Sequence, residues 1–171
     1  IAVSGYMSSI KQKLNSLCAE ANSCASEADL QSVLSASARL EDDIYSVMIY
    51  DERGRLLLYG NESDDKVKDG ARDMLLNKSE LVSASSGFAV TDPHVNSMYK
   101  DKYPWVVTIA RQEYSSLFKQ QVYVAIDYKF SQIATYIDNI SIGQRGYCYI
   151  INSKGDVIYH PQQQMLFSGI K

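Results

Sequence analysis

A chain of 171 residues is long enough for one domain with a buried core, since domains typically run to about 100–150 residues. Its formal net charge of −3 argues against the basic surface that marks nucleic-acid-binding proteins. No apolar run approaches the ~18 residues that span a bilayer, and no basic-then-apolar signal peptide opens the chain, so we expect a soluble piece of a larger protein.

Two helices are expected first. Apolar residues recur at helical spacing over residues 3–21, which predicts an amphipathic helix. Ser26 follows a weak point at residues 22–23, and Asp29 stands three positions later. A serine at this place caps a helix by accepting a backbone N–H, so Ser26 is expected to begin a second helix that ends near Leu40.

Residues 45–59 have the pattern of strand, tight turn and strand, with Gly54 supplying the positive φ that such a turn requires. Ser63 then predicts the start of a short helix. Asp64 and Asp65 would occupy its first turn, where the helix dipole favours acidic residues. Met74 and the residues around it would supply its buried face.

The second half of the chain reads mainly as strands. A short strand is expected at residues 88–90, followed by a long polar loop over 91–102. Residues 105–111 and 121–127 are rich in β-branched and aromatic side chains, which predicts two strands joined by a long hairpin loop at 112–120. Strands joined by hairpins form an antiparallel sheet, and helices packed on one give a two-layer α+β domain.

A helix is expected over residues 130–140, and the hairpin pattern then returns at 147–160, with Gly155 in the place of Gly54. Two hairpins of one pattern, about a hundred residues apart, predict two related modules in tandem. Too few residues follow the second hairpin to complete another core. We therefore expect one complete module followed by the start of a second.

These segments resemble a known family. The long first helix, residues 49–54 (Ile-Tyr-Asp-x-x-Gly), residues 124–127 (Val-Ala-Ile-Asp) and the stretch 146–161 are similar to the double Cache sensor domain, an extracytoplasmic relative of the PAS fold. The last stretch is the most specific and resembles the membrane-proximal module of YesM-like sensor kinases. The resemblance implies a membrane-distal Cache module at 1–142 and a truncated opening hairpin of the proximal module at 143–171.

The implied function is ligand sensing without catalysis or cofactor. The resemblance favours the sensor domain of a two-component histidine kinase, with a methyl-accepting chemoreceptor as the alternative and a small secreted hydrolase as the alternative of a different class. The parent protein would be membrane-anchored and homodimeric, with this part on the extracellular face of the cell membrane. A small polar molecule is the expected partner.

The family's amino-acid-sensing branch grips the ligand carboxylate with an Arg two positions before a Trp-Tyr pair, and takes the amino group with an Asp on the last distal strand. Trp105 and Asp127 match that Trp and Asp. Tyr103 stands in place of the Arg, and Val106 in place of the Tyr, so the forked bonds to a carboxylate would be missing. An α-amino acid is therefore disfavoured, and a sugar is slightly favoured.

Each candidate binding residue has an alternative structural role. Trp105 is a stacking wall for a ligand or a half-buried core residue. Asp127 is a ligand acceptor or the cap of the helix that follows it. Arg111 and Tyr123 complete a polar cluster if their strand faces point the same way; otherwise Arg111 is a solvated edge residue. Tyr99 closes over a pocket or only pins its loop.

Other reactive side chains carry no catalytic pattern. His94 and His160 are expected in loops or turns, because no nucleophile elbow of the Gly-x-Ser-x-Gly type accompanies them. Cys18 and Cys24 are six residues apart and would pair only if the chain turned between them; their default role is that of small apolar residues. No Cys–His spacing indicates a zinc site.

Overall fold

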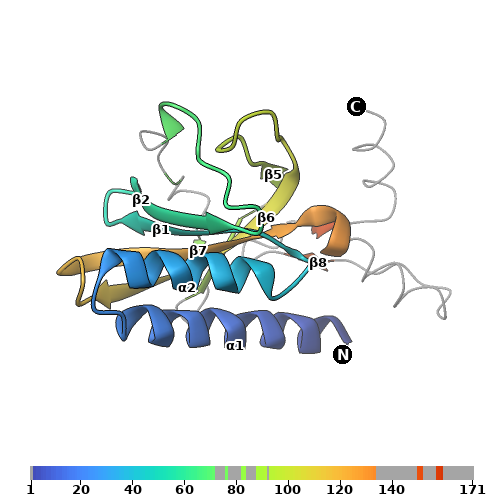
Figure 1. The fold of residues 1–171 in the computed structure, drawn as a ribbon. Helices are drawn as coiled ribbons and strands as arrows, with labels where there is room; N and C mark the ends of the chain where they lie inside the picture. Colours follow the sequence, from blue (N-terminus) through green and yellow to red (C-terminus); the bar gives the residue numbers. More distant parts are fainter. Residues whose placement is uncertain are drawn as a thin grey trace, which may run out of the picture.

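Two antiparallel helices begin the chain and an antiparallel sheet follows them, as the computed structural model in Figure 1 shows. The structure describes residues 2–71, 76, 82–83, 88–91, 93–133, 150–151 and 157–159. Its elements are α1 (Ala2–Asn22), α2 (Glu27–Arg39), β1 (Ile44–Asp51), β2 (Leu56–Asn61), β3 (Val82–Ser83), β4 (Phe88–Val90), β5 (His94–Val95), β6 (Trp105–Ser115), β7 (Gln120–Lys129), β8 (Ile150–Ile151) and β9 (Val157–Tyr159).

The larger sheet has seven strands. Six follow the order β2-β1-β7-β6-β4-β3, β5 pairs with β6, and all the pairings are antiparallel. Both helices lie on one side of this sheet, and β5 with the long loops lies on the other (Figure 1). The predicted α+β class is confirmed, and the arrangement is consistent with a PAS-like sheet flanked by a long N-terminal helix.

Both predicted helices are present. The Ser26 hydroxyl accepts a hydrogen bond from the Asp29 N–H at 3.1 Å, so Ser26 caps α2 as expected. The side chains facing the sheet from the helices are apolar and form the main core with the strands beneath them. Its helix members are Ile10, Leu14, Leu17, Cys18, Ala21, Leu30, Leu34 and Ala38. Within the described part of the chain, no helix is both long and apolar enough to cross a membrane.

Gly60 lets α2 approach β2 very closely. A Cβ atom at this position would lie 2.7 Å from the backbone N of Ser35 and 2.8 Å from the backbone C of Leu34. Only glycine permits this approach without a backbone shift, since both contacts are to the α2 main chain. The resulting contact places one end of β2 directly under the middle of α2.

The hairpin predicted at residues 45–59 is formed by β1 and β2. Asp51 Oδ1 accepts hydrogen bonds from the N–H groups of Arg53 and Arg55, both at 2.9 Å, which stabilises the turn. Gly54 has a φ of 88°, the positive value expected for it. The sequence pattern therefore predicted both the strands and the chemistry of their turn.

The short helix predicted from Ser63 is wrong over the residues described. Residues 62–70 contain turns and a single bridge between Val67 and Tyr99, and none of them is α-helical. Asn61 Oδ1 accepts from the Asp65 N–H at 2.8 Å, and Asp64 adopts a positive φ of 53°. This Asx-type closure competes with the first helical turn for the same backbone groups. The remaining predicted helix residues up to Leu75 lie outside the described part.

The loop predicted at residues 112–120 is also wrong, because the strands on both sides are longer. β6 continues to Ser115 and β7 begins at Gln120, so four residues remain for the turn. Ser115 Oγ accepts from the Phe118 N–H at 3.1 Å, and Lys119 has a φ of 55°. Ladder bonding to the partner strand stabilises this polar stretch, which its composition alone did not indicate.

Toward the C-terminus, residues 130–133 are helical, in agreement with the start of the predicted helix. The rest of that helix lies outside the described residues, as do Gly143, Cys148 and His160. β8 and β9 pair antiparallel, with Ile150 opposite Tyr159, which agrees with the strands of the predicted second hairpin. The division of the chain at residue 142 remains a prediction.

Candidate functional site

The two faces of the sheet differ in character. Along β7, Val124 and Ile126 face the helices and belong to the main core, whereas Ala125 and Asp127 face the loops. The loop face carries a second cluster of buried apolar and aromatic side chains. Its members are Met48, Tyr50, Leu56, Met98, Tyr99, Ala110 and Ala125. We call this side the loop face and the opposite side the helix face.

Asp127 is a buried carboxylate on the loop face, with 3% of its surface exposed. Its Oδ2 accepts a hydrogen bond from Asn96 Nδ2 at 2.7 Å, and its Oδ1 accepts one from Thr108 Oγ1 at 2.5 Å. Thr108 is the direct cross-strand partner of Asp127 in the ladder between β6 and β7. Asn96 approaches from the loop after β5. Both oxygens are therefore held within the sheet and its covering loop, not at the start of the helix at residue 130.

Burial raises the pKa of the Asp127 carboxyl above its usual range. The Thr108 hydroxyl, the nearby His94 ring and the Asn96 amide each oppose this effect by favouring the ionised form. Among the described residues, no lysine or arginine forms an ion pair with Asp127. A buried carboxylate that no lysine or arginine neutralises is costly, and such groups are concentrated at functional sites.

Aromatic side chains surround this carboxylate. Tyr99 is fully buried, its hydroxyl lies 2.6 Å from Ser46 Oγ, and its ring makes edge-to-face contacts with Tyr45 and Tyr59 at 5.7 and 6.1 Å. Tyr45 Oη is buried and has no hydrogen-bond partner among the described residues. Burial, with Asp65 and Asp127 adding to it, raises the pKa of Tyr45 to about 12. The loop face thus carries an acceptor, the Asp127 carboxylate, and a hydroxyl without a partner among the described residues, that of Tyr45.

The structure does not bring all the candidate residues together. Asp127, Tyr123 and Tyr99 belong to the loop face, with Tyr99 in its interior and Tyr123 packed at its margin. Trp105 packs half-buried against the main core on the helix face, which favours its structural role. Tyr103 lies in the loop before β6, 60% exposed, with Lys68 Nζ 5.8 Å from its ring centroid.

Arg111 also lies on the helix face. Its guanidinium donates to Asn15 Oδ1 on α1 and lies 5.9 Å from the centre of the Phe88 ring. Tyr123 is on the opposite side of the sheet, so the condition for a cluster of Arg111 and Tyr123, that their strand faces point the same way, is not met. Antiparallel pairing places Gln112, not Arg111, opposite Tyr123. The predicted cluster of Arg111 and Tyr123 does not form.

Cys18 and Cys24 are free thiols, so the pairing considered from the sequence is absent. Both belong to the region of α1 and the turn that follows it, with Cys18 buried under the sheet. Among the described residues, no group of three or more potential metal ligands is present.

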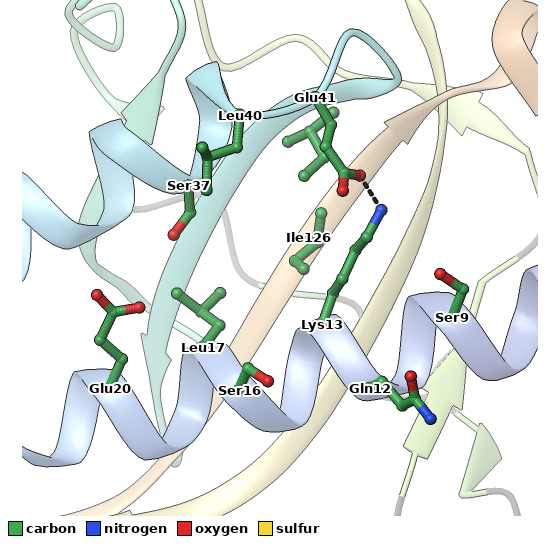
Figure 2. Close-up of a pocket in the computed structure, with 11 residues that line it drawn as sticks. Ser9, Gln12, Lys13, Ser16, Leu17, Glu20, Ser37, Leu40, Glu41 and Ile126 are labelled. Atoms are coloured by element: carbon green, nitrogen blue, oxygen red, sulfur yellow. Dashed lines mark ion pairs between the residues drawn. The ribbon is translucent and has the colours of Figure 1, made fainter.

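A groove of about 350 Å³ lies on the helix face between the two helices and the sheet. Figure 2 shows Lys13 extending from α1 to form an ion pair with Glu41, which follows α2. Leu17 and Ile126 contribute apolar surface to the groove. Lys13 and Glu41, two of its charged side chains, pair with each other, whereas no lysine or arginine among the described residues pairs with Asp127 on the other face. The groove offers a cavity on the helix face, whereas the buried carboxylate without a lysine or arginine partner lies on the loop face; the loop face is therefore our candidate site on chemical grounds.

The sequence did not indicate the polar partners of Asp127. Asn96 belongs to a stretch interpreted only as a polar loop, and Thr108 to a strand interpreted only as apolar. Pairing of β6 with β7 in the right register was required to place Thr108 opposite Asp127. A polar residue in the middle of a buried strand was the available signal.

Solved structures similar to this chain include ligand-binding domains of chemoreceptors. The ligand-binding domain of the Pseudomonas fluorescens chemoreceptor CtaA in complex with L-serine has a TM-score of 0.67 at 16% identity, covering 95% of this chain and 67% of its own. The sensory domain of Campylobacter jejuni Tlp3 with isoleucine bound has a TM-score of 0.64 at 12% identity, covering 96% and 66%. The ligand-binding domain of Pseudomonas aeruginosa PctC with GABA has 0.65 at 15%, covering 94% and 70%.

These likenesses establish a shared fold. The chain spans about two thirds of the length of these structures. No family model matches the chain, and no curated protein matches it in sequence.

One expectation is overturned by these findings. From the sequence, the absence of an Arg before Trp105 disfavours an α-amino acid and favours a sugar. The structures with this fold instead bind serine, leucine, isoleucine, valine and GABA. The expectation assumed that one short motif supplies the carboxylate donors. In this chain Trp105 packs against the core on the helix face, away from the loop face that carries Asp127.

Proposed function

We propose that this chain is an extracytoplasmic ligand-binding module of a bacterial transmembrane receptor, and that the receptor is a chemoreceptor. The likeness to chemoreceptor domains supports this reading over the sensor histidine kinase preferred from the sequence. In this proposal residues 1–142 form the membrane-distal module and residues 143–171 begin a second one. The full receptor is anchored in the membrane, with this part outside the cell.

The observation that carries the proposal is the buried Asp127 carboxylate. An ionised carboxylate accepts hydrogen bonds at about four lone-pair sites, and Asn96 and Thr108 occupy two of them. A ligand ammonium group would supply both the missing donors and the missing positive charge. The ligand class that this chemistry fits is a small molecule with a primary amine, α-amino acids included. The complexes of the similar structures support this class.

The aromatic cluster would supply the apolar part of such a site. Tyr45, Tyr50 and Tyr99 all lie near enough to Asp127 for its charge to contribute to their raised pKa values. Ligand sites commonly combine aromatic walls with a few convergent polar groups. Tyr45 Oη, which has no partner among the described residues, is a further donor for a ligand oxygen.

Thermal unfolding with added ligand tests the proposal. L-Serine, L-leucine, L-isoleucine, L-valine and GABA are each compared with an analogue that lacks the amine, such as 4-methylpentanoate for leucine, and with glucose. A ligand at a hundred times its dissociation constant stabilises the native state by about 2.7 kcal/mol, so a binder raises the melting temperature by several degrees. The amine-free analogue and glucose should have little effect.

Asp127→Asn should abolish the response to the amine while retaining the shape of the side chain. Asp69→Asn is the matched control, because Asp69 is an exposed carboxylate in the loop after β2. If no amine raises the melting temperature, or if Asp127→Asn responds as the wild type does, the proposed ligand class and site are wrong.

A further inference from the structure

A continuous chain of polar contacts leads from the loop after β4 to Asp127. Thr91 Oγ1 lies 3.2 Å from His94 Nδ1, and His94 Nε2 lies 3.3 Å from Thr108 Oγ1. Thr108 Oγ1 in turn lies 2.5 Å from Asp127 Oδ1. The four side chains come from three strands and one loop. Together they connect a half-buried imidazole to the buried carboxylate through a single hydroxyl.

Counting the available protons shows which atom donates in each of these hydrogen bonds. An ionised carboxylate only accepts, so the one hydroxyl proton of Thr108 is committed to Asp127. Thr108 Oγ1 can then only accept from the imidazole, which requires His94 to carry a proton on Nε2. In the neutral ring, Nδ1 is consequently the acceptor, and the Thr91 hydroxyl donates to it.

The other oxygen of Asp127, Oδ2, faces a group that can only donate. Asn96 Oδ1 accepts from the Met98 N–H at 2.9 Å, so the Asn96 amide is oriented with Nδ2 toward Asp127. An amide NH₂ donates and does not accept. A change in the protonation of Asp127 therefore changes the direction of a hydrogen bond on the Thr108 side and not on the Asn96 side.

We propose that His94 is a positioning residue of the ligand site: through the Thr108 hydroxyl it holds Asp127 in the ionised, acceptor-only form that an ammonium ligand requires. The part played by the ligand rests on the proposed function. The coupling between His94 and Asp127 belongs to the empty protein and is tested without any ligand.

The other titratable groups facing Asp127 are tyrosines. Tyr45 and Tyr50 approach from β1 and Tyr99 from the loop, and burial is the first cause of the raised pKa of each. A neutral phenol adds no positive charge. Among the groups that shift the pKa of Asp127, His94 is therefore the one that carries a proton-dependent positive charge.

Asp127→Asn should reverse the direction of the hydrogen bonds that join residue 127, Thr108 and His94. With Asn96 Nδ2 fixed as a donor, the new side chain must turn its oxygen to Asn96 and its NH₂ to Thr108. Thr108 Oγ1 then accepts from this amide and gives its own proton to His94 Nε2. The imidazole must in response carry its proton on Nδ1. Asp127→Asn, which reaches His94 only through Thr108, is therefore expected to change the tautomer of His94.

Nuclear magnetic resonance of ¹⁵N-labelled histidine measures this tautomer directly. Spectra are recorded over a pH series, up to the pH above which the His94 signals no longer change, so that the neutral ring is observed. His94→Gln identifies the His94 signals by their loss and so separates them from those of His160. We expect the Nε2–H form in the wild type and the Nδ1–H form in Asp127→Asn.

Thr108 provides the matched pair of controls. Thr108→Val removes the hydroxyl at nearly constant shape, and Thr108→Ser retains it. The valine variant should lose the strong Nε2–H preference although Asp127 is intact, whereas the serine variant should keep it. These two variants test the coupling of His94 to Asp127 even if Asp127→Asn folds poorly. The same tautomer in the wild type, Asp127→Asn and Thr108→Val would overturn the proposed coupling.

Stability against pH gives a second readout. Because burial raises the pKa of Asp127, its contribution to the free energy of unfolding is present on the acid side and is lost as pH rises through that pKa. His94→Gln removes the cation that lowers the pKa, so the loss should be larger and should end at higher pH. The difference between the wild type and His94→Gln should vanish in an Asp127→Asn background. A difference that persists there would contradict the coupling.

Ligand binding completes the test. L-Isoleucine affinity, measured by calorimetry, should be several-fold lower in His94→Gln than in the wild type, because Asp127 is then held less firmly in the ionised form that accepts from the ammonium group. Equal affinities of the two proteins would contradict the positioning role. Failure of all amines to bind would refute the proposed function, whereas the tautomer result would still decide the coupling.

Discussion

Gly60→Ala tests how closely α2 approaches the sheet. The added Cβ would lie 2.7 Å from Ser35 N, 2.8 Å from Leu34 C and 3.0 Å from Ser35 Cα. Ordinary van der Waals contact for such an atom begins near 3.4 Å. All three neighbours are main-chain atoms, so no side chain can turn away to make room. The backbone of α2 or of β2 must therefore move.

The size of the effect follows from two opposing contributions. Overpacking of a well-packed contact costs about 1–3 kcal/mol. Replacing glycine also reduces the entropy of the unfolded chain, which stabilises the protein by about 0.4–1 kcal/mol. Since α2 carries Leu30 and Leu34 of the main core, its displacement loosens buried contacts as well. We expect a net loss of about 1–2 kcal/mol in the free energy of unfolding.

Equilibrium urea unfolding followed by circular dichroism measures this loss. Gly70→Ala serves as the comparison, because its Cβ would meet nothing within 4 Å while its φ of 81° adds backbone strain. Gly70→Ala should lose about 1–2 kcal/mol of stability, while the amide signals of α2 in a nuclear magnetic resonance spectrum stay in place. Gly60→Ala should move them. A Gly60→Ala protein as stable as the wild type, with α2 signals unchanged, would refute the close packing of α2 on β2.

Two further outcomes follow from the buried groups. Tyr99→Phe should lower the free energy of unfolding by about 1 kcal/mol, because it removes a buried 2.6 Å hydrogen bond to Ser46; an unchanged urea midpoint would contradict this. A thiol reagent at neutral pH should label Cys24 in the native protein and Cys18 only after denaturation, since Cys18 is 2% exposed and burial raises its pKa to about 12. Equal labelling of the two peptides, measured by mass spectrometry, would show that Cys18 is accessible.

Local patterns determined much of the fold. The helical repeat over residues 3–21, the Ser26 cap and the Gly54 turn each depend on residues a few positions apart, and all three are present. The α+β class followed from the order of these elements. Such features are accessible from a sequence because the forces that form them act within one turn or one hairpin.

Hydrogen bonds that compete with the helical or loop pattern caused the errors in secondary structure. Ser63 and the acidic residues after it are good helix starters, yet the Asn61 side chain closes a different turn there. Residues 112–115 are polar, yet ladder bonds extend β6 through them. In the first case the deciding acceptor is a side chain four residues before Asp65, and in the second it is the partner strand β7, which the local pattern does not contain.

The candidate site was predicted only in part. Asp127 was selected from the sequence, but its alternative role as a helix cap could be set aside only when Asn96 and Thr108 were seen to hold its oxygens. Trp105 and Arg111 were grouped with it, and the pleat of the sheet places both on the other face. Alternation along one strand shows which residues share a face. Which of the two faces the helices cover is decided by packing between elements far apart in the chain, and only the tertiary structure contains that information.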